Sequence, residues 1–272
     1  MSIIIEYNQS TGLGDQYTGI YSIHGIYLNL LSKINSSIYI YSNSDTSCYF
    51  GHNPAGLSFY SKIFDYSLIN EILFFNTKIP NNFILKRNYN NIFKFYSDNN
   101  DDDELLTNLN INLYGHEYLR QSKNSYNPLK IQPLINNNII NSISHTITRP
   151  MIVFHLRFED GWDYHNNVEI YHTLFKQIEK ISLQYLNHDI VIGGRGDFVD
   201  QIQNKHKFII KSENYLLNNI FDSVINSAKD MVLFSYADKI YTYCKWPTNF
   251  LTYSILHNKK QKQYTDLIEN IL

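Results

Sequence analysis

The sequence predicts an α/β protein with two βα-rich halves that face each other across a cleft. The chain opens as a strand (Ser2–Tyr7), a loop, a helix (16–33) and a second strand (Ser37–Ser42), which is the unit from which parallel sheets are built. From residue 150 onward, short apolar runs again alternate with amphipathic segments. The length of 272 residues suits one large domain or two of ordinary size.

The composition is that of a globular protein. Hydrophobic residues make up 43% and charged residues 18% of the chain, so it can bury a core and is not expected to be disordered. The net charge of −2 and the pI near 6.5 give no general attraction to nucleic acid or to an anionic membrane. We therefore expect no nucleic-acid partner, and any bound anion must be held by a local cluster.

The cysteines and the hydropathy of the sequence indicate the cellular environment that the chain fits. Cys48 and Cys244 form neither a disulfide framework nor a metal-type spacing. The first residues lack the basic and apolar regions of a signal peptide. No stretch approaches the roughly 18 uninterrupted apolar residues of a membrane span. These features predict a soluble, cytoplasmic protein in a reducing compartment, with no metal site and no membrane span.

The loop after the first strand is one candidate ligand site. Gly12 and Gly14 let backbone N–H groups approach a phosphate or sugar, and the start of the following helix favours negative charge. A tight turn without a ligand, with Asp15 capping the helix, is the alternative. The glycines do not form GxGxxG and no Walker A tail follows, so a nicotinamide oxidoreductase is disfavoured. The helix is predicted from apolar residues at three- and four-residue spacing, namely Ile20, Ile23, Tyr27, Leu30, Leu31 and Ile34.

The middle of the chain carries fewer signals. Residues 43–60 are rich in Ser, Asn, Gly and Pro and are expected to form a loop, and 68–75 contains a short apolar run. Residues 81–103 are polar and weakly patterned. Their acidic end is expected to be a solvated loop, because consecutive carboxylates repel and a metal site needs convergent ligands. The Asn- and Pro-rich segment 127–141 marks a domain boundary before the second half.

The start of the second half combines a buried strand with a group of charges. Residues 151–154 form an apolar run after Pro150, as expected of a strand buried on both faces. Ionisable residues follow at once, namely His155, Arg157, Glu159, Asp160 and Asp163. Open α/β sheets bind ligands at the carboxyl ends of their strands, and a guanidinium such as that of Arg157 matches phosphate. The alternative is an ordinary strand followed by a charged surface loop.

The remaining elements alternate regularly. Helices are predicted over 167–186, 198–205, within 216–234, from 248 to 256, and over 264–272. Strands are predicted over 188–192, 208–210 and 239–243, and the first of these is expected to end at a turn formed by residues 193–197.

Three stretches together resemble the fucosyltransferase superfamily with the GT-B fold, and specifically the α1,6-fucosyltransferases of nodulation and N-glycan core type. They occur in the family's order and are TGLGDQYTGIYSIHGIYLNLLSKINSSIYI, IVFHLRFEDGWDYHNNVEIYHTLFKQIEK and DMVLFSYADKIYTYCKWPTNFLTYSIL. The resemblance implies two Rossmann-like domains: residues 1–148 on the acceptor side and 149–272 on the donor side. The last helix is a candidate to pack back on the first domain. It also implies an inverting, metal-independent transferase that moves a deoxyhexose, with fucose as the first candidate, from a GDP-sugar to a glycan hydroxyl.

The resemblance also assigns residues. Arg157 occupies the position of the arginine that binds the donor's diphosphate, and His155 that of the motif histidine near the nucleotide. Asp160 matches the motif aspartate and ranks first as catalytic base, ahead of Asp163, with Glu159 and Asp15 as further candidates. The other donor-binding positions that it assigns are Gly12, Gly14, Asp15, Asp197 and Thr248, and Lys245 is added to them for its charge.

Two departures from the family pattern leave an alternative open. Core-type enzymes have a second arginine where this chain has Phe158, and the family's serine-rich turn before the last helix is replaced by residues 244–248, in which Lys245 could supply positive charge. Loss of these groups would suit a catalytically inactive protein that binds a sugar nucleotide or a glycan on the same scaffold. Each carboxylate could equally serve a structural hydrogen bond or salt bridge.

Overall fold

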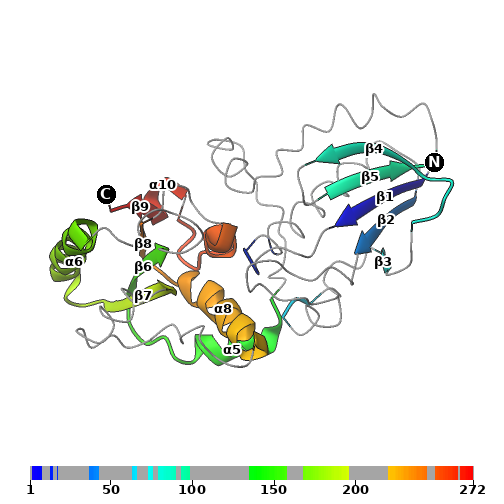
Figure 1. Ribbon diagram of the computed structural model, residues 1–272. Coiled ribbons are helices and arrows are strands. Elements are labelled where there is room, and N and C mark those ends of the chain that lie inside the picture. The colour runs from blue at the N-terminus through cyan, green and yellow to red at the C-terminus, as the bar shows by residue number, and fades with distance from the viewer. Residues whose placement is uncertain are drawn as a thin grey trace. The chain divides into compact units, whose positions relative to one another are not determined.

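The structure is a computed structural model and describes residues 2–7, 13–14, 17, 37–42, 63–65, 73–75, 79–89, 93–98, 135–157, 168–195, 220–243, 249–262 and 264–271. The chain divides into two compact units, Met1–Asn136 and Asn137–Leu272 (Figure 1). The boundary predicted from the sequence lies after residue 148. Each unit is described by itself.

The first unit contains a mixed five-stranded sheet with the order β3-β2-β1-β5-β4 (Figure 1). Its strands are β1 (Ser2–Tyr7), β2 (Ser37–Ser42), β3 (Leu73–Phe75), β4 (Ile84–Tyr89) and β5 (Phe93–Ser97). The first three are parallel to one another, whereas β5 is antiparallel to both β1 and β4. The predicted strands β1 and β2 are confirmed.

The central position of β1 follows from its apolar composition. Ile3 and Ile4 are 0% and 2% exposed, so both faces of the strand are covered. Near its end, the carboxylate of Glu6 accepts a hydrogen bond of 2.7 Å from the Tyr96 hydroxyl and lies 3.6 Å from Lys94 Nζ. The charge of Glu6 is therefore satisfied by its antiparallel neighbour β5.

The hairpin formed by β4 and β5 was not predicted. The sequence indicated only a polar, weakly patterned segment over 81–103. In the structure, Phe95 and Ser97 are buried whereas Lys94 and Tyr96 are half-buried, which is the alternation of a strand with one face toward the core. The many asparagines around these short strands obscure that period in the sequence.

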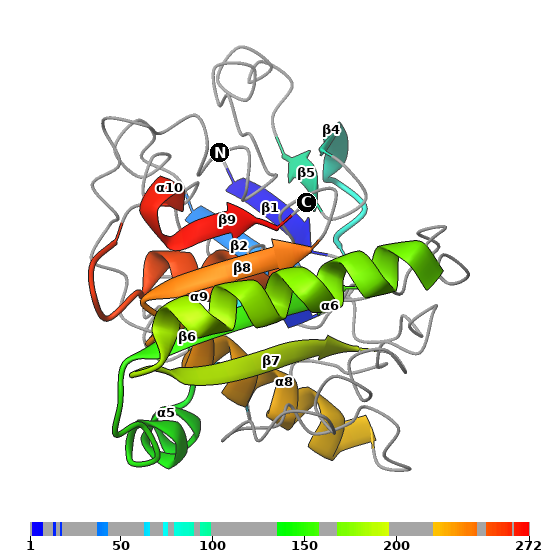
Figure 2. The ribbon, with the colours of Figure 1, turned by 90° about the vertical axis from the view of Figure 1, so that its left-hand side faces the viewer.

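The second unit contains a parallel sheet with the order β7-β6-β8-β9. Its strands are β6 (Met151–Arg157), β7 (Asp189–Arg195), β8 (Lys239–Tyr243) and β9 (Ile268–Asn270). Figure 2 shows these strands side by side with α6 (Val168–Ser182) in front of them. The central strand β6 pairs with β7 on one side and with β8 on the other.

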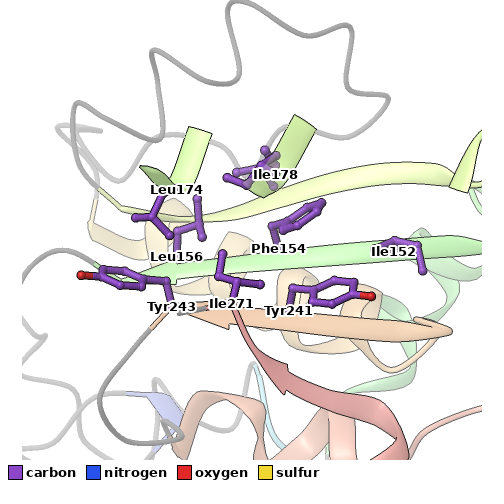
Figure 3. Packing of buried hydrophobic residues seen from close by; sticks show 9 residues of the cluster. Ile152, Phe154, Leu156, Leu174, Ile178, Tyr241, Tyr243 and Ile271 are labelled. Atoms are coloured by element: carbon purple, nitrogen blue, oxygen red, sulfur yellow. The ribbon is translucent and has the colours of Figure 1, made fainter. Parts of the chain in front are cut away.

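Helices cover both faces of β6. On one face, Ile152, Phe154 and Leu156 pack with Leu174 and Ile178 of α6 in a fully buried cluster (Figure 3). On the other face, the apolar side chains of β6 and its neighbours pack with residues of α8 (Ile220–Phe234), η3 (Asn249–Leu251) and α9 (Thr252–Leu256); this cluster includes Met151, Val153, Val191, Ile240, Leu233, Phe234 and Leu251. This double burial is what the continuous apolar run predicted.

Several predicted elements of the second unit are confirmed and others need correction. The helix over 167–186 corresponds to α6 and the 3₁₀ turn η2 (Leu183–Tyr185), the helix within 216–234 to α8, and the strand over 239–243 to β8. The strand predicted to end at residue 192 instead continues through Gly193 and Gly194 to Arg195, because both glycines stay paired with β6.

The C-terminal segment also differs from its prediction as a helix over 264–272. Only α10 (Tyr264–Leu267) is helical, and the chain then forms β9, which pairs in parallel with β8. The free edge of β8 offers backbone N–H and C=O groups, which a strand can pair with and a helix cannot. The short helix α5 (Asn137–Ser144), in the segment predicted as a boundary, packs against α8.

We expect Phe154→Ala to lower the free energy of unfolding of the second unit by about 3–5 kcal/mol, the usual range for a buried phenylalanine truncated to alanine. Phe154 is 0% exposed, and its ring stacks on Tyr241 with a centroid distance of 5.4 Å. Urea unfolding followed by circular dichroism measures the change. Leu186→Ala is the control: Leu186 is 76% exposed, and a change above about 0.5 kcal/mol there would indicate an unrelated cause.

We expect the chain to lose stability as the pH falls from about 6.5 toward 4, in part because of His257. Burial, and secondly the charge of Lys259, lower the pKa of His257 to about 4. The folded state therefore favours the neutral ring, which costs nothing above pH 6.5 and about 3 kcal/mol near pH 4. His257→Gln should flatten this part of the pH–stability curve. The exposed His172 of α6 gives the control His172→Gln, which should leave the curve unchanged.

Candidate functional site at the carboxyl end of the parallel sheet

The topology of the second unit defines where a ligand can bind. The connection leaving β6 leads to α6 on one face of the sheet, whereas the connection leaving β8 leads to η3 and α9 on the opposite face. The two connections therefore diverge at the carboxyl ends of two neighbouring strands. In open α/β sheets, such a switch point leaves a crevice where ligands bind.

His155 is the described side chain that brings titratable chemistry to this switch point. It lies on β6 and is only 6% exposed. Its imidazole stacks on the ring of Phe250, with a centroid distance of 5.5 Å and an interplanar angle of 6°, and meets the Phe234 ring nearly edge-on at 5.9 Å. Phe250 belongs to η3 and Phe234 ends α8, so the imidazole is on the face covered by those elements.

Gly193 makes this packing possible. It is the register partner of His155 on β7, and a Cβ at this position would overlap Cζ of Phe234. The missing side chain gives Phe234 the space it occupies beside His155. The plane of the imidazole is fixed by packing against the two rings of Phe234 and Phe250, and Gly193 leaves room for Phe234.

Thr242 is a second polar residue at the same level of the sheet. It pairs with His155 from β8 and is 5% exposed. Its Oγ1 is buried and has no hydrogen-bond partner among the residues that the structure describes. Buried hydroxyls are normally hydrogen-bonded, so the Oγ1 of Thr242 is a feature of this end of the sheet that the packing of the described residues does not explain.

The residues predicted for the site are placed as follows. His155 is buried on β6, Arg157 is the last residue of that strand, and Gly14 is buried in a helical turn of the first unit. Leu13 and Gly14, which were predicted to lie in a loop, are helical. The other predicted residues lie outside the described part of the chain, namely Gly12, Asp15, Glu159, Asp160, Asp163, Asp197, Lys245 and Thr248.

Sequence analysis missed three residues of this end of the sheet: Gly193, Thr242 and Phe250. Gly193 had been interpreted as part of a turn, and Thr242 as an ordinary strand residue. The available signal was the pair of consecutive glycines at the end of an apolar run, which is typical of close approach by another group. Nothing local connects Phe250 with His155, since the two residues are 95 positions apart in the sequence.

The described residues limit the chemistry of this end. They bring a histidine and a threonine together beside aromatic rings, so the site can donate and accept hydrogen bonds and can stack on a flat group. No group of three His, Cys, Asp or Glu that could hold a metal occurs in the described ranges. None of the helices described there is long and apolar enough to cross a lipid bilayer.

Comparison with known proteins identifies the fold. No family model and no curated protein matches the sequence. Among solved structures, NodZ α1,6-fucosyltransferase co-crystallised with GDP superposes with a TM-score of 0.55 at 13% identity, over 94% of this chain and 93% of that one. The chain has a fucosyltransferase-like fold. The resemblance predicted from the sequence is confirmed at that level.

Two related structures give the same result. Fucosyltransferase NodZ from Bradyrhizobium has a TM-score of 0.55 at 13% identity, with 94% of this chain and 93% of that chain covered. NodZ soaked with GDP-fucose has a TM-score of 0.50 at 12% identity, with 94% and 92% covered. The fucosyltransferase-like fold therefore extends over nearly the whole chain, at an identity that leaves individual site residues to be established on their own.

We expect Thr242→Val to stabilise the chain by about 1 kcal/mol, because it removes a buried hydroxyl without a partner while keeping the branched shape. Thermal and urea unfolding of the ligand-free chain measure the change. Thr242→Ser keeps the hydroxyl, removes a methyl group and should be destabilising. A valine variant less stable than the wild type would show that the Thr242 hydroxyl is hydrogen-bonded in the folded chain.

Proposed function

We propose that the protein is an inverting, metal-independent glycosyltransferase that moves a deoxyhexose from a GDP-sugar to a glycan hydroxyl, with fucose as the first candidate. The observation that carries the proposal is the fold shared with NodZ over 94% of the chain. The proteins compared are α1,6-fucosyltransferases with GDP or GDP-fucose.

The structure of the second unit supports the donor side of this proposal. A GDP-sugar needs groups that hold an anionic diphosphate at a strand end. The carboxyl end of β6 carries Arg157 as its last residue and the buried His155 two positions earlier. A guanidinium can neutralise the charge that develops on the departing GDP, where a preorganised donor has its largest effect on rate. His155 would hydrogen-bond a phosphate or ribose oxygen.

The acceptor side needs a base that takes the proton of the attacking hydroxyl. We assign this role first to Asp160 and then to Asp163, both of which follow β6 within six residues. The further donor contacts are proposed for Gly12, Gly14, Asp15, Asp197, Lys245 and Thr248. In this proposal residues 1–148 form the acceptor side and residues 149–272 the donor side.

GDP should stabilise the chain selectively. At a concentration one hundred times its dissociation constant, a ligand that binds only the folded state adds roughly 2.7 kcal/mol to the free energy of unfolding. Thermal unfolding with GDP, UDP and NAD measures this effect. We expect an increase in melting temperature with GDP and none with NAD. A chain that GDP leaves unchanged would contradict the assignment of the donor.

Turnover is tested separately from binding. The wild type should release GDP from GDP-fucose in the presence of a suitable glycan from an acceptor panel, and Arg157→Ala should reduce the rate strongly. EDTA should leave the rate unchanged. Binding of GDP without turnover of GDP-fucose across the panel would favour the inactive sugar-nucleotide-binding protein instead.

A further inference from the structure

Two arginines occupy neighbouring positions at the carboxyl end of the parallel sheet. Arg157 is the last residue of β6, Arg195 is the last residue of β7, and the two are register partners. Adjacent strands lie about 4.8 Å apart, so the two positions are adjacent although 38 residues separate them in the sequence. The connection between these strands forms α6, which covers one face and leaves the strand ends together.

The opposite end of the same two strands shows complementary charges. There Arg149, just before β6, forms an ion pair with Asp189 at the start of β7, with 3.3 Å between Nη1 and Oδ1. The same strand pair therefore places arginine beside aspartate at its amino end and arginine beside arginine at its carboxyl end. The carboxyl end of this strand pair thus brings two positively charged residue types to paired positions, whereas the amino end pairs opposite charges.

The backbone of β7 maintains this pairing in a conformation that favours glycine. Gly194 directly precedes Arg195 and has a φ of 141°. A Cβ there would overlap the backbone carbonyl of its register partner Leu156. Any other residue would force β7 away from β6 one position before the two arginines. The close approach at Gly194 thus holds Arg195 in register with Arg157.

We propose that Arg195 binds the diphosphate of the sugar nucleotide together with Arg157. This inference rests on the proposed function, and it adds a residue from a different strand to the donor site. A diphosphate has two phosphoryl groups, and each guanidinium can donate two parallel hydrogen bonds to one of them. The two negative phosphoryl groups of the ligand would match the two positive charges that the strand ends supply.

The test compares Arg195→Gln with the wild type by calorimetric titration with GDP, GMP, guanosine and inorganic pyrophosphate. Loss of a bidentate charged contact should weaken binding of GDP and pyrophosphate by about tenfold or more. GMP should lose less and guanosine nothing. The ligand-free variant should melt close to the wild type, because Arg195 is the last residue of its strand. Arg195→Lys, which keeps the charge but not the fork, should be intermediate.

Arg149→Gln is the matched control, because it removes an arginine from the other end of the same strands. It should lower stability through loss of the pair with Asp189 and leave the affinity for GDP unchanged. An Arg195→Gln variant that binds GDP and pyrophosphate like the wild type would overturn the role of Arg195 alone. If the wild type binds pyrophosphate but not GDP, the proposal that the donor is a GDP-sugar is wrong. The proposal that Arg157 and Arg195 bind a diphosphate then still stands. A wild type that binds neither would contradict both.

Discussion

The burial of β6 on both faces is the constraint on which the second unit depends. The strand pairs on both edges, and helices pack on both faces, so every position from Met151 to Leu156 is buried. A strand in this situation must be apolar along most of its length. Polar groups can accumulate only at its two ends: Arg149 and Asp189 pair at the amino end, and His155 and Arg157 lie at the carboxyl end. The proposed donor site is therefore located by the burial of β6, and its two principal residues are the first ones that follow the apolar run.

The same burial determines how His155 is held. Its ring lies among aromatic side chains of α8 and η3, and the neighbouring strand contributes a glycine because a larger residue would displace Phe234. Packing of this kind fixes a side chain before any ligand arrives, which lowers the cost of ordering the site on binding. The buried hydroxyl of Thr242, which has no partner among the described residues, is unfavourable for the ligand-free chain. Such features occur where function requires them.

The sequence predicted the elements whose signal is local. β1, β2, β8, α6 and α8 were found from apolar runs or helical spacing, and His155 and Arg157 were found because they end the strongest apolar run. The hairpin of β4 and β5 was missed because its alternation covers only a few residues among asparagines. The strand β9 was missed because its pairing with β8 depends on an edge formed by distant residues.

The parts of the site that escaped prediction depend on register. Arg195 is a candidate because β7 continues past Gly193 and Gly194 in pairing with β6, which no local pattern of the sequence indicates. Phe250 and Thr242 came to His155 through helix packing and strand order, which no spacing along the chain records. Asp160, Asp163, Asp197, Lys245 and Thr248 lie outside the described part of the chain, and their roles stay predictions.

The most direct test of the central claim is a crystal structure of the chain with GDP bound. The account predicts the diphosphate at the carboxyl ends of β6 and β7, within hydrogen-bonding distance of Arg157 and Arg195 and close to His155. GDP bound at the amino end of the parallel sheet, or on the sheet of the first unit with the ends of β6 and β7 empty, would contradict it.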